Sequence, residues 1–145
     1  MKILLDNEDL KGNYESFNEA YFQSIIDTIA EYVEFEGDSE LSIVLTDDES
    51  IASMNQQYRN KPEATDVLSF PMEEEFMLGD IVISLDTAAR QAQEAEIDIE
   101  LETAFLFIHG FLHLLGYDHE TSDLNATEMF DLQEEILRDW VKNDK

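Results

Sequence analysis

The stretch from Asp98 to His119, DIELETAFLFIHGFLHLLGYDH, decides how this 145-residue chain is organised. Its long apolar part predicts a buried helix from Asp98 to Leu115. Gly116 follows at the position where helices commonly end, because glycine adopts a left-handed conformation at little cost. All the histidines of the chain lie between His109 and His119. We therefore expect a functional site at the end of a buried central helix.

The three histidines have the spacing of metal ligands. His109 and His113 are four residues apart, so their side chains lie one turn apart on the same helix face. After the break at Gly116, His119 can fold back to complete a triad around one ion. The chain has no cysteine, and three imidazoles are typical of a catalytic zinc site that keeps one position open for water or substrate. Nickel, copper and iron also accept imidazole ligands, so the residues alone leave the metal open.

The three histidines have two alternative interpretations. A single histidine among apolar residues is more often a core residue than a ligand, although three at this spacing favour a metal. The same offsets occur in the metzincin proteases, H-E-x-x-H-x-x-G-x-x-H. This chain has Gly110 where that motif has its glutamate general base, which counts against a metal-dependent peptidase or amidohydrolase.

Two acidic residues beside the last histidine are candidates for supporting roles. Asp118 could orient a ligating imidazole through a hydrogen bond, as carboxylates often do around metal sites. It could equally satisfy backbone groups in the turn after the helix. Glu120 and Asp118 are the adjacent candidates for a general base, and the sequence leaves that role unassigned.

The composition excludes several classes of protein. The chain carries 35 acidic and 8 basic residues, a net charge of −27, which argues against an extended basic groove for nucleic acid. Hydrophobic residues make up 43% of the chain, enough for the core of one domain over residues 1–145. The first residues lack the apolar region of a secretory signal and no apolar run approaches membrane-spanning length, so we expect a soluble intracellular protein.

Arg59 is the candidate phosphate ligand. It lies in the segment from Ile51 to Pro71, whose formal charge is zero because Arg59 and Lys61 balance two acidic residues. The planar guanidinium group can bind a phosphate through two hydrogen bonds, which a lysine cannot reproduce. By itself, however, an arginine in such a helix is more often a surface residue.

The remaining sequence predicts an α+β fold, a single domain with a small mixed sheet of about four strands and about five helices. Alternating and β-branched residues predict strands over Lys2–Asp6, Leu41–Leu45, Asp66–Phe70 (stopped by Pro71) and Ile81–Leu85. Besides the buried helix, apolar periodicity predicts a helix over Tyr14–Phe35 and a second one through Ile51, Met54 and Tyr58, with N-cap candidates from Thr46 to Glu49. A third helix is expected through Arg90 to Glu94, with Asp86 as its cap. A last helix, capped by Ser122 or Asp123, carries the apolar residues Met129, Leu132, Ile136, Leu137 and Trp140.

Three segments of the chain, His109–His119, Tyr58–Pro71 and Leu78–Ser84, resemble motifs of one family. This is the YbeY family of bacterial rRNA-maturation endoribonucleases. His109–His119 resembles its H-G-x-L-H-L-x-G-Y-D-H signature. Tyr58–Pro71 and Leu78–Ser84 are similar to two further motifs, in the same order along the chain. Asn60 and Ala64 depart from the family, which often has glycine and proline at these positions of the loop.

The resemblance implies a zinc-dependent endoribonuclease specific for single-stranded RNA. It implies one Zn²⁺ on His109, His113 and His119, and catalytic roles for Arg59 and His113. The implied task is maturation of the 3′ end of small-subunit (16S) rRNA and ribosome quality control in the cytoplasm. The implied partners are ribosomal RNA and the small ribosomal subunit, with a ribosomal protein as a candidate helper, and neither DNA nor a membrane. A ribosome-assembly factor with a structural metal and little catalysis stays open.

Overall fold

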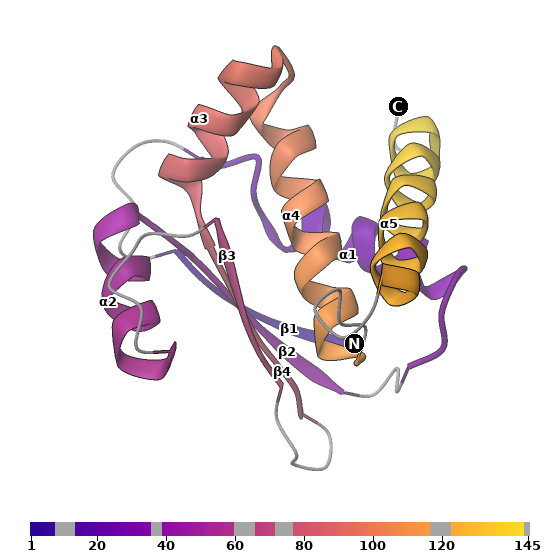
Figure 1. Ribbon diagram of the computed structural model, residues 1–145, viewed down its shortest axis with the longest axis horizontal. Coiled ribbons are helices and arrows are strands. Elements are labelled where there is room, and N and C mark those ends of the chain that lie inside the picture. Colours follow the sequence, from indigo (N-terminus) through magenta and orange to yellow (C-terminus); the bar gives the residue numbers. More distant parts are fainter. Residues whose placement is uncertain (8–13, 36–38, 60–65, 72–76, 117–122, 144–145) are drawn as a thin grey trace.

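The computed structural model describes residues 1–7, 14–35, 39–59, 66–71, 77–116 and 123–143. A four-stranded mixed sheet carries helices on both faces (Figure 1). The elements in chain order are β1 (Lys2–Asp6), α1 (Glu19–Ala30), β2 (Glu40–Thr46), α2 (Asp48–Arg59), β3 (Val67–Pro71), β4 (Met77–Ser84), α3 (Leu85–Ala95), α4 (Ile99–Leu114) and α5 (Asp123–Asn143). The predicted α+β class, with its four strands and five helices, is confirmed.

The sheet has the strand order β1-β2-β4-β3. β1, β2 and β4 are parallel to one another, whereas β3 runs antiparallel to β4 at the edge of the sheet. Side chains alternate between its two faces, as the strand period requires. In β4, Ile81 and Ile83 belong to the larger core, while Val82 belongs to a smaller core with Ile51 of α2. Two apolar layers of unequal size therefore flank the sheet.

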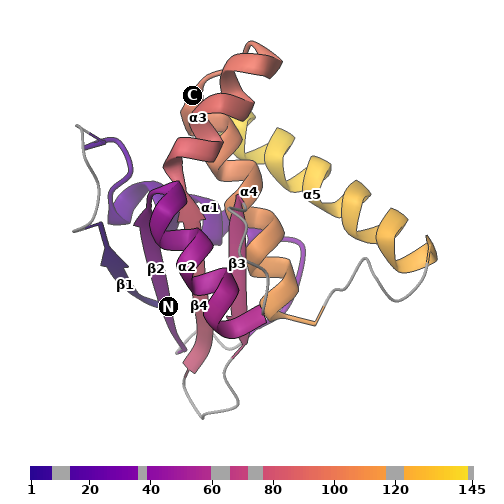
Figure 2. The same cartoon turned by 60° about the vertical axis from the view of Figure 1, so that its left-hand side comes forward.

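The larger layer contains α4 at its centre. Figure 2 shows α1, α4 and α5 on one side of the sheet and α2 on the other. Phe107, Ile108 and Phe111 of α4 are fully buried. Phe107 makes an edge-on ring contact with Phe22 of α1, with ring centroids 5.0 Å apart. A helix that is apolar almost all round must be buried on most sides, and α4 meets the sheet, α1, α3 and α5.

The ends of α4 match the prediction. Asp98 is its N-cap residue and Leu115 its C-cap residue. Gly116 follows with a φ of 100°, in the region that side chains with a Cβ rarely adopt. The amide of Gly116 donates to the carbonyl of His113 at 3.0 Å. The helix thus ends immediately after the second histidine, as the sequence indicates.

Two predicted helix starts are wrong for a local reason. The helix expected over Tyr14–Phe35 spans only Glu19–Ala30, because the Asn18 side chain accepts a hydrogen bond from the amide of Tyr21 (2.9 Å) and sets the first turn. Asp86 does not cap α3. Ser84 does, since its hydroxyl accepts from the amide of Thr87 at 3.3 Å.

The strand predicted over Ile81–Leu85 is also displaced, because β4 begins at Met77 and Leu85 is the first residue of α3. The other boundaries are closer to the predictions. Asp47, one of the N-cap candidates for α2, accepts a hydrogen bond from the amide of Ser50 at 2.8 Å. Pro71 does not stop β3 but is its last residue, which an edge strand tolerates because one side needs no ladder hydrogen bond. α5 begins at Asp123, and the alternative cap, Ser122, lies outside the described residues.

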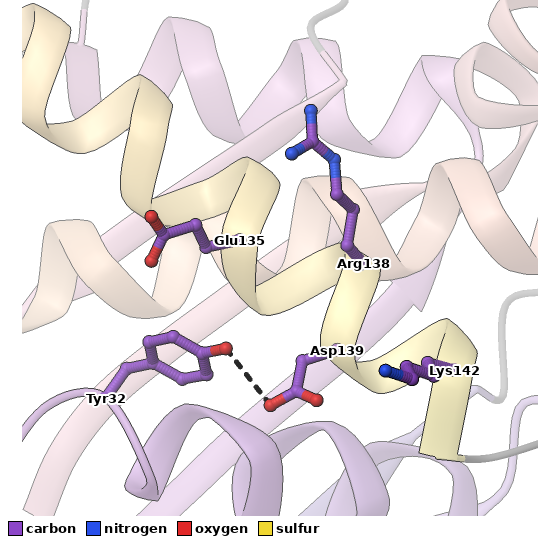
Figure 3. A pocket seen from close by; sticks show the side chains of 5 residues that line it. All are labelled: Tyr32, Glu135, Arg138, Asp139 and Lys142. Carbon is purple, nitrogen blue, oxygen red and sulfur yellow. Dashed lines mark hydrogen bonds between the residues drawn. The ribbon is translucent and has the colours of Figure 1, made fainter.

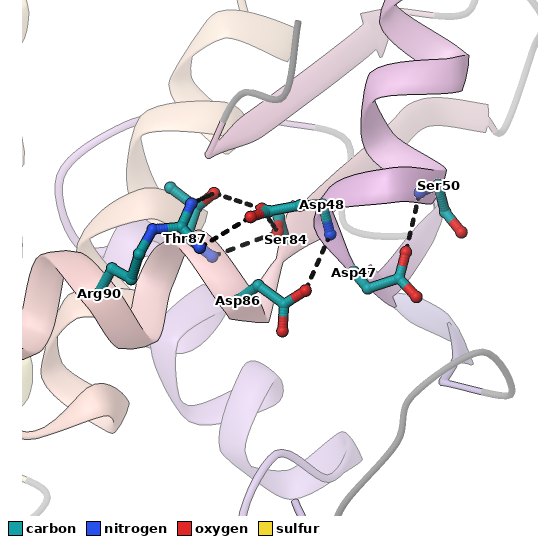
Figure 4. A network of polar contacts seen from close by, with 7 residues as sticks. All are labelled: Asp47, Asp48, Ser50, Ser84, Asp86, Thr87 and Arg90. Atoms are coloured by element: carbon teal, nitrogen blue, oxygen red, sulfur yellow. Dashed lines mark hydrogen bonds and ion pairs between the residues drawn. The ribbon is translucent and has the colours of Figure 1, made fainter.

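A polar network joins the start of α2 to the start of α3 (Figure 4). One carboxylate oxygen of Asp48 accepts from the hydroxyls of Ser84 and Thr87, both at 2.6 Å. The other lies 2.8 Å from a guanidinium nitrogen of Arg90. The amide of Asp48 in turn donates to the carboxylate of Asp86 at 3.1 Å. Asp86, in the first turn of α3, therefore holds the first amide of α2.

Within the described part of the chain, no helix is long and apolar enough to cross a membrane.

Candidate metal centre

His109 and His113 lie side by side in the last turns of α4. Their ring centroids are 4.5 Å apart, and the two Nε2 atoms approach to 3.0 Å. Both side chains are partly buried. The helical spacing of four residues places them together, as predicted from the sequence. The described structure therefore brings two of the three proposed ligands to one point.

The two nitrogens fit a shared metal ion. Zinc binds histidine nitrogen at about 2.0–2.1 Å, so two such atoms on one ion lie no more than about 4.2 Å apart. The observed 3.0 Å between the Nε2 atoms of His109 and His113 is within that limit. The proposed third ligand, His119, lies outside the described residues, as do Asp118 and Glu120. Among the residues that are described, no three His, Cys, Asp or Glu side chains come together in this way, so the triad stays a prediction.

The Nδ1 atom of His109 faces α5. It lies 3.3 Å from the Oε1 atom of Gln133, a side chain that is only 1% exposed. This residue was not predicted from the sequence. A signal was present, because Gln133 is a polar residue on the helix face that buries Met129, Ile136 and Trp140. Its partner, however, is set by how α5 packs on α4, which the sequence does not state.

Gly110 faces the sheet. A Cβ atom at this position would lie 3.0 Å from Ser69 Oγ, 3.2 Å from Ile81 Cγ2 and 3.3 Å from Val67 Cγ2. The Ser69 hydroxyl also donates to the Gly110 carbonyl at 3.2 Å. The absence of a Cβ at Gly110 thus lets α4 approach β3 and β4 closely, and any added side chain would press on atoms of both strands. A glutamate here would point into packed side chains, so this position could not supply the base of a peptidase.

Arg59 is the last residue of α2, and its side chain lies outside the described part of the structure, as does Lys61. The preceding Tyr58 is 64% exposed and its ring packs on that of Phe70, with centroids 5.3 Å apart. Figures 1 and 2 show the C-terminal ends of α2 and α4 pointing toward the same end of the molecule, on opposite sides of the sheet. β3 connects the two, since Phe70 meets α2 and Ser69 meets α4.

A separate hollow of about 250 Å³ lies against the outer side of α5. Figure 3 shows its lining residues, Tyr32, Glu135, Arg138, Asp139 and Lys142. The Tyr32 hydroxyl donates to Asp139 at 3.0 Å, and desolvation together with this carboxylate raises the pKa of Tyr32. Neither His109 nor His113 lines the hollow, and the α5 residues that line it lie on the helix face opposite Gln133, given 3.6 residues per turn. We therefore do not connect it with the metal centre.

A family model described as Endoribonuclease YbeY matches residues 4–141. The chain belongs to the YbeY family. This confirms the resemblance that the histidine motif and the two preceding motifs indicated.

Individual relatives agree with the family assignment. A protein of Persephonella marina named Endoribonuclease YbeY is 42% identical over 143 residues, which cover 94% of this chain and 92% of that relative. A protein of Bacillus mycoides with the same name is 38% identical over 94% of this chain and 96% of its own length. The solution structure of a Thermotoga maritima protein superposes with a TM-score of 0.70 at 30% identity, covering 97% of this chain and 90% of that one. The YbeY fold therefore extends over nearly the whole chain.

Proposed function

We propose that this chain is a metal-dependent endoribonuclease that cleaves single-stranded RNA and matures the 3′ end of small-subunit (16S) ribosomal RNA. The observation that carries the proposal is the pair of imidazoles at the end of α4, with Nε2 atoms 3.0 Å apart, in a chain of a family named for endoribonuclease activity. The proposal treats residues 1–145 as one catalytic domain. It also includes a part in ribosome quality control in the cytoplasm.

The metal we propose is zinc, one ion per chain, held by His109, His113 and His119. Neutral imidazole suits zinc well, and a set of three leaves one coordination position for water or a phosphate oxygen. When bound, zinc supplies a Lewis acid that polarises a phosphate oxygen or lowers the pKa of a bound water. The part of the protein is to fix the imidazoles on a rigid, buried helix. His113 is then both a ligand and a residue essential for catalysis.

Arg59 is the residue we propose to bind the scissile phosphate. A guanidinium group near a phosphate stabilises the charge that develops during cleavage. The place of Arg59 at the end of α2 supports this role. The preceding residue of α2, Tyr58, packs on Phe70 of β3, and the neighbouring Ser69 of β3 contacts the histidine turn of α4. Asp118 is proposed to orient a ligating imidazole, and the general base is left unassigned.

The net charge of −27 limits how RNA can be bound. Such a field repels a polyanion at long range, so we propose that RNA is contacted through a narrow patch around Arg59 and the histidines. The small ribosomal subunit, with a ribosomal protein as a helper, would then provide most of the binding surface. DNA and membranes have no place in this proposal.

One alternative of a different class is a ribosome-assembly factor whose metal is only structural. It shares the histidine centre with the nuclease and differs in what Arg59 does. If the metal is structural, replacement of Arg59 changes neither metal content nor any RNA cleavage. A peptidase is not favoured, because Gly110 packs against the sheet at 3.0 to 3.3 Å from three side chains.

The test compares cleavage of a single-stranded 16S precursor RNA by three preparations: protein as purified, stripped with a chelator, and reloaded with zinc. Arg59→Ala is assayed beside Arg138→Ala, a matched control whose exposed guanidinium pairs with Glu134 of its own helix. We expect cleavage to disappear on stripping and to return on reloading. Arg59→Ala should lower the rate by about 10²–10³-fold, the usual effect of removing one group that stabilises transition-state charge. Its metal content and the rate of Arg138→Ala should not change.

Metal dependence, the role of Arg59 and RNA cleavage itself can each be refuted by a different result. Stripped protein that is folded and cleaves as fast as reloaded protein would refute metal dependence. Full activity in Arg59→Ala would remove Arg59 from the site. Reloaded protein that binds zinc but cleaves no RNA, even with small ribosomal subunits present, would favour the assembly factor.

A further inference from the structure

Gln133 is an unusual residue to find inside α5. Its side chain is 1% exposed and shares the buried face of the helix with Met129 and Ile136. Burying an amide costs free energy unless its polar atoms find partners. The Nε2 atom of Gln133 has no hydrogen-bond partner among the described residues. An apolar residue of similar size would avoid this cost.

The carbonyl half of the amide has a partner. Gln133 Oε1 lies 3.3 Å from His109 Nδ1, a long hydrogen bond between α5 and α4. A carbonyl oxygen can only accept, so the hydrogen of this bond must be on Nδ1 of His109. In a neutral imidazole the other nitrogen, Nε2, then carries the lone pair. Gln133 therefore selects the tautomer of His109.

The selected tautomer is the one a shared ion requires. His109 Nε2 is the atom that approaches His113 Nε2 to 3.0 Å. With Nδ1 protonated, the Nε2 lone pair points to the side of the ring where the second imidazole lies. The opposite tautomer would place a hydrogen on Nε2 and block binding of a metal there.

We propose that Gln133 is a positioning residue of the metal centre: its Oε1 accepts the Nδ1 hydrogen of His109, fixes the ring, and presents the Nε2 lone pair to the ion. The inference rests on the metal centre of the proposed function. It makes α5 part of that centre, although α5 contributes no ligand. Among the described residues, the acceptor half of the amide has a partner and the donor half has none, which is the pairing that this role requires.

The test uses two substitutions that separate the acceptor from the donor. Gln133→Met keeps a similar volume in an apolar environment but removes the acceptor. Gln133→Glu keeps the acceptor and removes the unpaired NH₂ group. Gln91→Met is the matched control, since Gln91 is a partly buried glutamine whose amide donates to Asp66 at 3.3 Å. Zinc affinity of the full chain is measured by competition with a chromogenic chelator, and thermal unfolding of the metal-free proteins checks that each is folded.

We expect Gln133→Met to bind zinc about 10–100-fold more weakly, the usual cost of losing a hydrogen bond to a metal ligand. Gln133→Glu should bind at least as tightly as the wild-type chain, and Gln91→Met equally tightly. A merely structural glutamine would not give this order, because Met suits the apolar surroundings better than Glu does.

A second measurement does not involve metal. The ¹⁵N shifts of the imidazoles in the metal-free protein, at a pH at which they are neutral, report which nitrogen carries the hydrogen. The wild-type chain and Gln133→Glu should show His109 protonated on Nδ1, and Gln133→Met should lose this preference. If Gln133→Met does not fold, the ¹⁵N shifts of the wild-type chain still test whether His109 carries its hydrogen on Nδ1.

Two outcomes overturn the role of Gln133: wild-type zinc affinity in Gln133→Met, or a wild-type His109 that carries its hydrogen on Nε2. A wild-type chain that binds no zinc at all is a different result. It would refute the metal centre of the proposed function and, with it, the purpose assigned to Gln133.

Discussion

Two polar clusters of the molecule, the network around Asp48 and the histidine pair of α4, satisfy their polar atoms in different ways. The Asp48 carboxylate accepts from Ser84, Thr87 and Arg90. Every partner is supplied by the chain itself, and the result is a connection between α2 and α3. The histidine pair instead brings two Nε2 atoms to 3.0 Å from each other. The neighbouring Gln133 amide accepts from His109 through its oxygen, and its nitrogen has no partner among the described residues.

The difference separates a structural cluster from a candidate site. A network that is complete within the fold contributes to stability and needs no outside ligand. Two imidazole nitrogens that face each other are a favourable arrangement only if one carries a hydrogen or both bind a cation. We therefore expect changes at Asp48 to affect folding, and changes at the histidines to affect metal binding and RNA cleavage.

The largest expected effect comes from breaking the histidine pair. His113→Ala removes one of two converging nitrogens, and we expect loss of bound zinc and a fall in RNA cleavage to the level of chelator-treated protein. Metal content by mass spectrometry and the cleavage assay test this together. The metal-free variant should melt close to metal-free wild-type protein. A variant that is folded, free of metal and still active would contradict the assignment.

A large loss of stability is expected from Gly110→Glu. Its side chain would meet Ser69, Ile81 and Val67 within 3.0 to 3.3 Å of the first added carbon, and it would bury an unpaired charge. We expect the free energy of unfolding in urea to fall by about 3 kcal/mol or more. Gly110→Ala should cost much less, because the better helix propensity of alanine, about 1 kcal/mol, offsets its contacts. A stable Gly110→Glu protein with peptidase activity would revive the metzincin analogy.

Asp48→Asn tests the closed network. Hydrogen bonds to a charged group contribute about 1.5–3 kcal/mol, and we expect a loss of about 2 kcal/mol at neutral pH. Burial would raise the pKa of Asp48, but hydrogen bonds from Ser84, Thr87 and Arg90 and the charge of Arg90 lower it overall. The stability from the carboxylate is therefore complete above the unfolded pKa of about 3.9 and is lost as the pH falls through the lower folded pKa.

The measurement for Asp48 is urea unfolding as a function of pH. The difference between the wild-type chain and Asp48→Asn should shrink below about pH 4. RNA cleavage by the folded variant should stay at the wild-type rate. A variant with unchanged stability but impaired cleavage would reverse the roles we assign to the two clusters.

The smallest effect is expected at Gly116. A Cβ here would meet nothing within 4 Å among the described residues, so within them only the φ of 100° opposes alanine. We expect Gly116→Ala to cost about 1 kcal/mol in the free energy of unfolding. A cost as large as that of Gly110→Glu would mean that the C-terminus of α4 has packing partners beyond the described residues.

The sequence predicted what depends on local spacing. The apolar run and Gly116 define α4, and the four-residue step places His109 beside His113. The helix expected from Tyr14 was too long, since apolar spacing continues into a turn that packs on the core without being helical. Asn18, the residue that sets the true start, was not recognised.

What the sequence could not show depends on how distant elements pack. Gly110 was interpreted as the absence of a base, whereas the structure gives it a role in the contact between α4 and the sheet. Gln133 is 24 residues from His109 in the sequence, and only the packing of α5 on α4 makes them neighbours. His119, Asp118 and the side chain of Arg59 lie outside the described residues, so their roles stay predictions.

The central claim is that the end of α4 holds the metal of a nuclease. Anomalous scattering from zinc-loaded crystals tests it most directly, because it locates the ion without assuming its ligands. We predict one zinc peak per chain, bonded to Nε2 of His109 and of His113, with His119 as the third protein ligand. Zinc bound away from both imidazoles, or no bound zinc in a folded chain, would contradict the account.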